Sequence, residues 1–373
     1  MAHIKPVHTS KELSAFVDFP HALYKDDKKY VPELHIAQKD LLTKGKHPFH
    51  DHSELQLFLA YEGKEIVGRI AAVNNVNHNT FNKTNEGFFG FFDVVNNYEV
   101  AKLLLDEAFN WLKAKGFERV LGPVNPSTNE TCGVLIEGFD SAPVVMMTYN
   151  APYYIDILEK YGFQKETDLW AFLIESTDFK DKAARLLNVF EERLKSKNIT
   201  IRPANLKQFE KEVAGIEEVY NSAWDKNLGF VPMTDAEFKY MAKDMKMILD
   251  PDFCLVAEHE GKAIGFALCI PDLNEVMIKV KKGRLLPFGI FHLLFGIKKV
   301  KRLRVIALGV MEGYRKLGIE ACFYGRIINS GLKKGFTSAE ASWILEENVM
   351  MNQAVKNING KLYKKYRIYQ KAI

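Results

Sequence analysis

Residues 304–321 read RVIALGVMEGYRKLGIEA, an apolar run that leads through a short basic turn into a helical pattern. The apolar part predicts a buried strand, and Gly318 marks the point where the helix begins. A strand that turns directly into a helix points successive backbone N–H groups at one place, which suits a pyrophosphate. Arg315 and Lys316 would add positive charge there. The alternative is an ordinary strand-to-helix turn that needs its glycine only for tight geometry.

Upstream of this stretch the sequence indicates a β-hairpin, and the same pattern occurs earlier in the chain. Two apolar runs flank a Glu-Gly-Lys turn at 260–262, and two more flank an identical turn at 62–64. Glycine in a short connection between apolar runs is a hairpin signal. Both places are therefore expected to form paired antiparallel strands.

Further features recur in the same order in each half. Helical patterns at 98–115 and 319–334 are each closed by a Gly-Phe pair, the expected stop of a helix. Asn150 and Asn348 each precede a glycine by twelve residues, and an aromatic, strand-like run follows each glycine. Together these recurrences predict the internal duplication of a unit of roughly 150–170 residues.

The boundary between the two copies is expected where a charged amphipathic helix leads into a new strand. Apolar residues at helical spacing predict that helix at 179–198, and Ile199 begins the strand. The predicted domains are therefore residues 1–178 and 199–373, with the helix as their connector. A hairpin followed by alternating strands and helices predicts an α/β fold, in which each copy is a mixed sheet flanked by helices.

Composition excludes several classes of protein. The chain has 51 Lys and Arg against 47 Asp and Glu, so its net charge of +4 offers no polycation, and no DNA partner is expected. The four cysteines lie far apart, which fits a reducing compartment better than a disulfide framework. The first residues lack the apolar core of a secretory signal. These features predict a cytoplasmic globular protein.

One cluster of histidines invites a metal hypothesis. Residues 47–52 read HPFHDH, and three histidines so close together could chelate an ion. The proline between them and the lack of a further ligand at a known spacing favour a surface turn instead. No metal is therefore expected.

The opening stretch resembles the acyl-CoA loop of the GNAT superfamily of N-acetyltransferases. That loop follows a strand and reads Gln or Arg, two residues, Gly, one residue, then Gly or Ala; Arg315 and Gly318 match its first two fixed positions. Glu320 stands at the third, where a carboxylate would repel a pyrophosphate unless it turned outward. The whole chain resembles a tandem GNAT protein. More closely, it resembles a bacterial GNAT-like group through FFGFF, GPxNPS, NxGFxPxT and SWILExN segments, which here are residues 88–92, 122–127, 227–234 and 342–348.

The resemblance implies that the second copy binds acetyl-CoA or another acyl-CoA as co-substrate. Its strand would pair with the pantetheine arm, and its loop would hold the pyrophosphate. The residues expected to contact the cofactor are Leu308, Gly309, Val310, Arg315, Lys316, Leu317, Gly318 and Ile319. The first copy has neither Gly nor Arg after its strand at 87–92, so its acyl-CoA loop is expected to be degenerate.

The resemblance also implies a direct transfer, in which a small-molecule or peptide amine attacks the thioester while a base accepts its proton. Family members often place a proton-donating Tyr on the last helix, and that helix carries none here. The catalytic candidates by position are Glu346, Asn348 and Tyr363, and the substrate-side candidates are Asn227, Phe230 and Trp343. Glu346 could instead serve only to open a helix, and Phe230 could be a buried anchor.

A basic and apolar segment is predicted to be inserted between two strands of the second copy. Residues 276–311 contain no Asp or Glu, and two clusters of Lys and Arg flank an apolar run at 285–297. That run is too short to span a bilayer, which needs about 20 residues. Residues 279–304 could contact an anionic membrane or phosphates, or could cover a long acyl chain. The alternative is a helical hairpin with solvated lysines.

The sequence therefore predicts an acyl-CoA-dependent N-acyltransferase that moves an acyl group to an amine, and the acyl group that it favours is acetyl. A transferase that uses aminoacyl-tRNA or another acyl donor remains open, as does a non-catalytic or membrane-surface binding protein. One scaffold supports many chemistries, so the fold alone does not decide among them.

Overall fold

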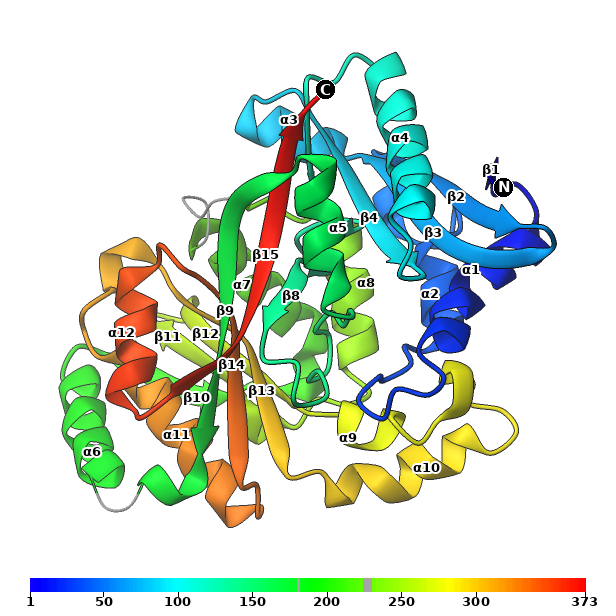
Figure 1. Ribbon diagram of the computed structural model, residues 1–373. Coiled ribbons are helices and arrows are strands. Elements are labelled where there is room, and N and C mark those ends of the chain that lie inside the picture. Colours follow the sequence, from blue (N-terminus) through cyan, green and yellow to red (C-terminus); the bar gives the residue numbers. More distant parts are fainter. Residues whose placement is uncertain (180–181, 224–229) are drawn as a thin grey trace. The chain divides into compact units, whose positions relative to one another are not determined.

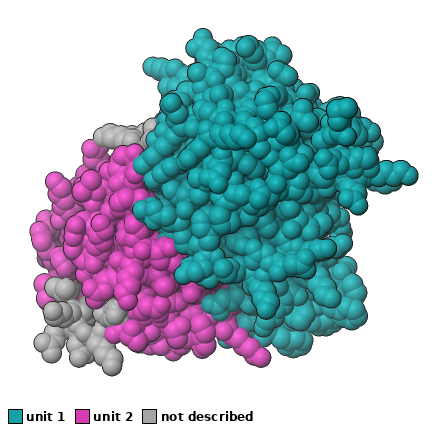
Figure 2. Space-filling view, in the orientation of Figure 1, with its two compact units in different colours: residues 1–169, 273–298, 364–373 teal, residues 170–272, 299–363 magenta. Residues whose placement is uncertain are grey.

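The computed structural model describes residues 1–179, 182–223 and 230–373, and the chain divides into two compact units (Figure 2). Unit 1 contains residues 1–169, 273–298 and 364–373, and unit 2 contains residues 170–272 and 299–363. Each unit is a mixed sheet with helices packed on it, so the predicted α/β fold is confirmed (Figure 1).

This division differs from the domain limits predicted at 178 and 199. Residues 273–298 and 364–373 come from the second half of the sequence but belong to unit 1. Strands β9 (Gln164–Glu175) and β15 (Lys361–Ala372) contribute residues to both units. Helix α6 (Lys182–Lys195), expected as a connector, lies in unit 2, where Leu187 and Leu194 are buried in the core.

In the sheet of unit 1, β4 (Glu86–Val94) and β5 (Arg119–Gly122) run parallel. The other neighbours among the first five strands, β8 (Val134–Glu137) and β15 run antiparallel. A separate two-stranded sheet is formed by β6 (Val124–Asn125) and β7 (Thr131–Cys132). The main sheet has the order β1 (Ala2–Pro6), β2 (Glu54–Glu62), β3 (Glu65–Asn74), β4 (Glu86–Val94), β5 (Arg119–Gly122) and β15, with β8 (Val134–Glu137) beside β15.

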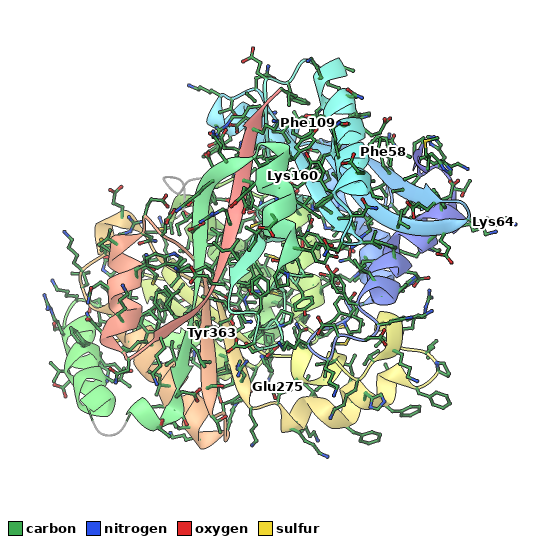
Figure 3. All side chains as sticks on the ribbon, viewed as in Figure 1. Phe58, Lys64, Phe109, Lys160, Glu275 and Tyr363 are labelled. Atoms are coloured by element: carbon green, nitrogen blue, oxygen red, sulfur yellow. The ribbon has the colours of Figure 1, made fainter. Side chains whose placement is uncertain are left out.

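The core of unit 1 forms where an apolar helix stripe covers this sheet. α4 (Tyr98–Ala114) presents apolar residues at helical spacing to β2, β3 and β4, and these side chains are fully buried. Phe58 of β2 and Phe109 of α4, both labelled in Figure 3, belong to this core. The other helices of the unit are α1 (Ser10–Leu23), α2 (His35–Leu41), α3 (Val76–Asn82), α5 (Tyr153–Tyr161), α9 (Asn274–Met277) and α10 (Gly289–Gly296).

The sheet of unit 2 repeats this plan. Its strands have the order β14 (Ser338–Leu345), β13 (Arg302–Val310), β12 (Lys262–Pro271), β11 (Cys254–His259) and β10 (Ile199–Pro203), and only β13 and β14 among these run parallel. α11 (Ile319–Lys333) buries its apolar stripe on this sheet, as α4 does in unit 1. The remaining helices are α7 (Phe209–Ala223), α8 (Asp235–Met245) and α12 (Val349–Asn357).

The structure confirms the predicted recurrences. The two Glu-Gly-Lys turns join β2 to β3 and β11 to β12, and their glycines take the positive φ angles of 60° and 76° that tight turns favour. α4 and α11 end where predicted, and α5 and α12 each lead into a long strand. The FFGFF segment is a strand with every residue buried.

Candidate functional site

The parallel strands β13 and β14 part halfway along their length, and we call this opening the unit 2 fork. β13 pairs with β14 only over residues 302–305, whereas its other edge stays paired with β12 as far as Val310. The register with β12 shifts at Leu268 and Cys269, so that Ile306 has no ladder partner there. Such a bulge bends and twists a strand. Residues 307–310, which include the predicted Leu308, Gly309 and Val310, therefore present an edge that β14 does not pair.

An unpaired strand edge can accept an extended ligand. Its N–H and C=O groups can bind an amide-containing chain as if it were an added strand. The pantetheine arm of a coenzyme A has this chemistry, because it carries amide groups along an extended chain. The backbone groups at the edge of the unit 2 fork have the chemistry that such a chain requires.

The start of α11 lies at the end of the same strand-and-turn segment. Gly318 precedes the helix with a φ angle of +98°, and no side chain caps the first N–H groups. These groups carry partial positive charge and remain available to an anion. A Cβ at Gly318 would lie 2.4 Å from Cδ1 of Phe190, so glycine is required here for space as well as for conformation.

Among the other residues of the predicted loop, some form hydrogen bonds that hold the turn in place and others pack in the core. Arg315 donates from Nε to the carbonyl of Val310 at 3.1 Å and from Nη2 to the carbonyl of Ala223 at 3.0 Å. Arg315 therefore holds the turn against its own strand and α7. Lys316 is exposed, whereas Ile319 is buried and Leu317 packs against the core, so these last two can offer a ligand only their backbone.

A buried carboxylate lies where the fork opens. Glu340 of β14 is 0% exposed and one residue before the last ladder pair with β13. Its carboxylate accepts a hydrogen bond from the Ser342 hydroxyl at 2.6 Å and another from the Tyr363 hydroxyl. Tyr363, labelled in Figure 3, lies near the start of β15. The sequence analysis missed Glu340, although a charged residue within the apolar strand SAEASWIL was a signal, since burying a charge is costly unless it is paired.

Arg304 and Trp343 complete this group, which we call the Glu340 cluster. Arg304 is buried and lies opposite Glu340 in the β13–β14 register. Its guanidinium carbon is 5.4 Å from the centre of the Trp343 ring, and its Nη2 donates to the carbonyl of Ser342 at 3.4 Å. The structure thus brings together two predicted site residues, Tyr363 and Trp343, around a carboxylate that was not predicted.

The remaining candidates lie elsewhere in unit 2 or outside the described residues. Asn348 caps α12, because its Oδ1 accepts the Met351 N–H at 3.1 Å, and Glu346 lies in the turn just before it. Phe230 is buried and packs against Tyr220, with ring centres 5.7 Å apart, as expected of a buried anchor. Asn227 lies outside the described residues.

The corresponding fork of unit 1 is filled by its own chain. β4 pairs with β5 only over Glu86–Phe88, but β6 then runs against β4: Asn125 Oδ1 accepts the Phe91 N–H at 2.6 Å. A Cβ at Gly90 would lie 1.7 Å from the carbonyl oxygen of Val124. The start of α4 is also occupied, because Asn97 Oδ1 accepts two of its N–H groups, at 3.0 and 3.4 Å. Both places where an acyl-CoA would bind are therefore taken.

Unit 1 instead contains a cavity of about 130 Å³, lined by both polar and apolar side chains, which we call the unit 1 cavity. Its centre is a buried ion pair: Arg69 donates from Nε to Asp93 Oδ2 at 2.8 Å, and its Nη2 lies 2.7 Å from the same oxygen. The Arg69 guanidinium also lies 4.9 Å from the centre of the Phe16 ring. Arg69 and Asp93 interrupt the apolar runs of β3 and β4, which was the signal that sequence reasoning did not use.

Neutral hydrogen-bonding groups surround that ion pair. The Tyr24 hydroxyl donates to the Tyr154 hydroxyl at 3.0 Å, and burial raises the pKa of both well above the ordinary range. His21 Nδ1 lies 2.9 Å from the Tyr30 hydroxyl, and burial lowers the pKa of His21 to about 4. Tyrosines and histidine are thus uncharged at neutral pH. The cavity can hydrogen-bond a small polar group. Glu33 also lines it, and burial raises the pKa of that carboxyl group.

Comparison with known proteins relates the chain to two curated bacterial proteins. No protein-family model matches it. A Caulobacter vibrioides protein called bacterial ceramide synthase is 33% identical over 381 residues, which cover 99% of this chain and 97% of that protein. Protein YghO of Escherichia coli is 33% identical over 370 residues, covering 97% of this chain and 93% of its own.

Solved structures share the fold at low sequence identity. A tandem GNAT protein from the clavulanic acid biosynthesis pathway aligns over 100% of this chain and 98% of its own, with a TM-score of 0.61 and 9% identity. A GCN5-related N-acetyltransferase from Sphaerobacter thermophilus aligns over 100% and 95%, with a TM-score of 0.55 and 11% identity. The chain therefore has the fold of tandem GNAT proteins, and it belongs to the family of the Caulobacter and E. coli proteins.

Proposed function

We propose that the protein is an acyl-CoA-dependent N-acyltransferase whose acyl-CoA site is the unit 2 fork. The observation that carries the proposal is the combination of an unpaired strand edge at residues 307–310 with the uncapped start of α11 at Gly318. The pantetheine arm pairs with the edge, and the pyrophosphate rests on the helix N–H groups. The filled fork of unit 1 supports one such site in each chain.

The transfer is direct. The amine nitrogen attacks the thioester carbon, backbone N–H groups of the fork stabilise the developing oxyanion, and the C–S bond breaks as the amide forms. The amine loses one proton to the Glu340 cluster, and the leaving thiolate takes one up. Tyr363, whose hydroxyl donates to Glu340, is the group through which that proton moves.

The cysteines argue against a covalent acyl-enzyme. All four are buried. Burial raises the pKa of the Cys254 thiol to about 12 and that of Cys322 to about 11. The thiolate is the nucleophilic form, and it is therefore scarce at neutral pH. Acyl transfer through a cysteine is therefore not favoured, which agrees with a direct attack.

The acceptor we propose is a long-chain amine. A ceramide is the N-acyl amide of a long-chain amino alcohol, and the Caulobacter relative carries the name of a ceramide synthase. The same bond, formed between an acyl-CoA and an amine, is the one that the unit 2 fork is suited to make. Comparing acetyl-CoA with palmitoyl-CoA as donors tests which length of acyl chain the protein transfers.

The test is an assay of amide formation by mass spectrometry. Purified protein is incubated with acetyl-CoA or palmitoyl-CoA and with sphinganine or a short alkylamine, and amide and released coenzyme A are quantified. We expect equal amounts of amide and coenzyme A with at least one pair, reduced in Tyr363→Phe. Coenzyme A release without amide, or no reaction with any pair, contradicts the proposal. Transfer from aminoacyl-tRNA instead would support the alternative donor.

A further inference from the structure

The segment at 273–298 displays apolar side chains to solvent from a helix that is firmly packed on its other face. Gly289, Leu293 and Gly296 recur at helical spacing along the inner face of α10. A Cβ at Gly296 would lie 2.6 Å from Val276 Cγ1, so the helix approaches its neighbour closely. The inner face of α10 is therefore closely packed against its neighbour.

The outer face of α10 is aromatic and aliphatic. Phe291, Leu294 and Phe295 are 52%, 60% and 72% exposed, and the two phenyl rings stack with centres 6.5 Å apart. Just before the helix, Leu286 and Phe288 are 78% and 74% exposed. Clustered exposed apolar residues on a soluble surface mark an interaction site, because water solvates them poorly.

The segment is well anchored to unit 1, so this exposure is not the result of a loose loop. Met277 and Val280 are buried against Val31, and Arg284 Nη2 lies 2.8 Å from a carboxylate oxygen of Asp18. Asn274, next to the labelled Glu275 in Figure 3, donates to the carbonyl of Pro143 at 3.0 Å. Asn274, Val31 and Pro143 also line the unit 1 cavity.

Positive charge lies on both sides of the apolar cluster. Lys279, Lys281 and Lys282 precede it and Lys298 follows it, and all four are exposed. No acidic residue lies within 276–298. The predicted basic surface was longer. Lys299 and Lys301 are exposed but belong to unit 2, whereas in β13 Arg304 is buried and Arg302 is partly buried. The part of it on unit 1 is a compact cationic and apolar patch.

We propose that this patch docks the protein on the surface of an anionic lipid bilayer. We call it the docking surface: Leu286, Phe288, Phe291, Leu294 and Phe295 with Lys279, Lys281, Lys282 and Lys298. Phe and Leu side chains enter the boundary between headgroups and acyl chains, while the lysines meet anionic headgroups. An RNA would engage the lysines but leave the exposed leucines in water. No helix in the described part of the chain is long and apolar enough to span a membrane.

The docking surface goes beyond the proposed function and does not depend on it. If the acceptor is a long-chain amine, the bilayer is where such a molecule resides, and the docking surface brings unit 1 to it. Acylation of a short, water-soluble amine needs no bilayer. The two proposals can therefore fail separately.

The experiment is co-sedimentation of the full chain with vesicles. One set contains equal parts of phosphatidylcholine and phosphatidylglycerol, and the other contains phosphatidylcholine alone. We expect binding to the anionic vesicles that weakens as salt rises, because screening acts on the lysines. The double variant Phe291→Ser/Phe295→Ser should lower the partition coefficient by at least about tenfold. Lys281→Gln/Lys282→Gln should weaken binding to anionic vesicles only.

The matched control replaces two comparably exposed apolar side chains of unit 2, outside the docking surface. Val189 and Met247 are 66% and 82% exposed and lie in unit 2, so Val189→Ser/Met247→Ser should bind vesicles as the parent does. Unchanged thermal melting shows that each variant is folded. The proposal is overturned if the unsubstituted protein does not co-sediment with anionic vesicles at low salt. It is also overturned if Phe291→Ser/Phe295→Ser binds them fully, or if the patch binds RNA and not vesicles.

Discussion

Glu340 is a fully buried carboxylate at the opening of the unit 2 fork, and two hydroxyl groups donate to it. Burying a carboxylate costs free energy of desolvation unless hydrogen bonds compensate for it. Such groups are often found at functional sites. The sequence analysis found Tyr363, which reaches this group, but not Glu340 itself. Its position along a motif suggested Glu346. The strand register, however, determines which carboxylate lies where the pairing of β13 with β14 ends, and that residue is Glu340.

We expect Glu340→Gln to lower kcat by about 100- to 10,000-fold, the usual contribution of acid–base catalysis, with little change in KM. Glutamine keeps the size, its amide oxygen can still accept a hydrogen bond from one of the two hydroxyl groups, and its NH2 group can donate to the oxygen of the other, so the fold should persist. Steady-state kinetics of amide formation measures both constants. The comparison variant is Glu346→Gln, which should keep most of the activity. Full activity in Glu340→Gln, or its loss in Glu346→Gln alone, would assign the base to the turn before α12.

The Arg69–Asp93 pair of unit 1 has a separate, structural consequence. Asp93→Asn leaves a buried guanidinium without its counter-charge, so we expect the free energy of unfolding to fall by about 3–5 kcal/mol. Chemical denaturation measures this directly. Glu137→Gln, which breaks the exposed pair with Lys365, should cost at most about 1 kcal/mol. Equal effects of the two substitutions would mean that the cavity pair is solvated.

At the scale of elements, the sequence was informative wherever one local pattern determines the outcome. Alternating apolar runs around Glu-Gly-Lys gave both hairpins, and helical stripes closed by Gly-Phe gave α4 and α11. The filling of the unit 1 fork by β6 could not be predicted in this way, because a two-residue strand has no periodicity and its partner is distant in sequence. The unit 1 cavity was missed for the same reason, since its walls come from segments that only the fold brings together.

The contrast between the starts of α4 and α11 gives a test of which copy binds acyl-CoA. Asn97→Ala removes the cap of α4 and should lower the free energy of unfolding by about 1 kcal/mol, whereas Asn97→Asp keeps the cap and the stability. Neither substitution should alter the affinity for acyl-CoA, because that site is assigned to unit 2. Thermal melting with and without ligand measures both quantities. A loss of affinity in Asn97→Ala would move the site to unit 1.

At the scale of the whole molecule, the two units differ in which strand edges and helix starts they leave open. Unit 2 keeps an open fork and an uncapped helix start, whereas unit 1 has closed both and carries the cavity and the docking surface. One chain should therefore bind one acyl-CoA. Duplication and fold class could be predicted from sequence, but this division of roles follows from tertiary contacts.

The most direct measurement is isothermal titration of the full chain with acetyl-CoA, palmitoyl-CoA and free coenzyme A, alongside two glycine variants. Gly318→Ala should abolish the heat, because its Cβ would meet Phe190 and its φ angle is +98°; Gly313→Ala should keep it, because nothing lies within 4 Å of its Cβ. We predict one ligand per chain, lost in Gly318→Ala and kept in Gly313→Ala. Two ligands per chain, equal binding by the two variants, or no heat with any of the three compounds would contradict an acyl-CoA site at the unit 2 fork.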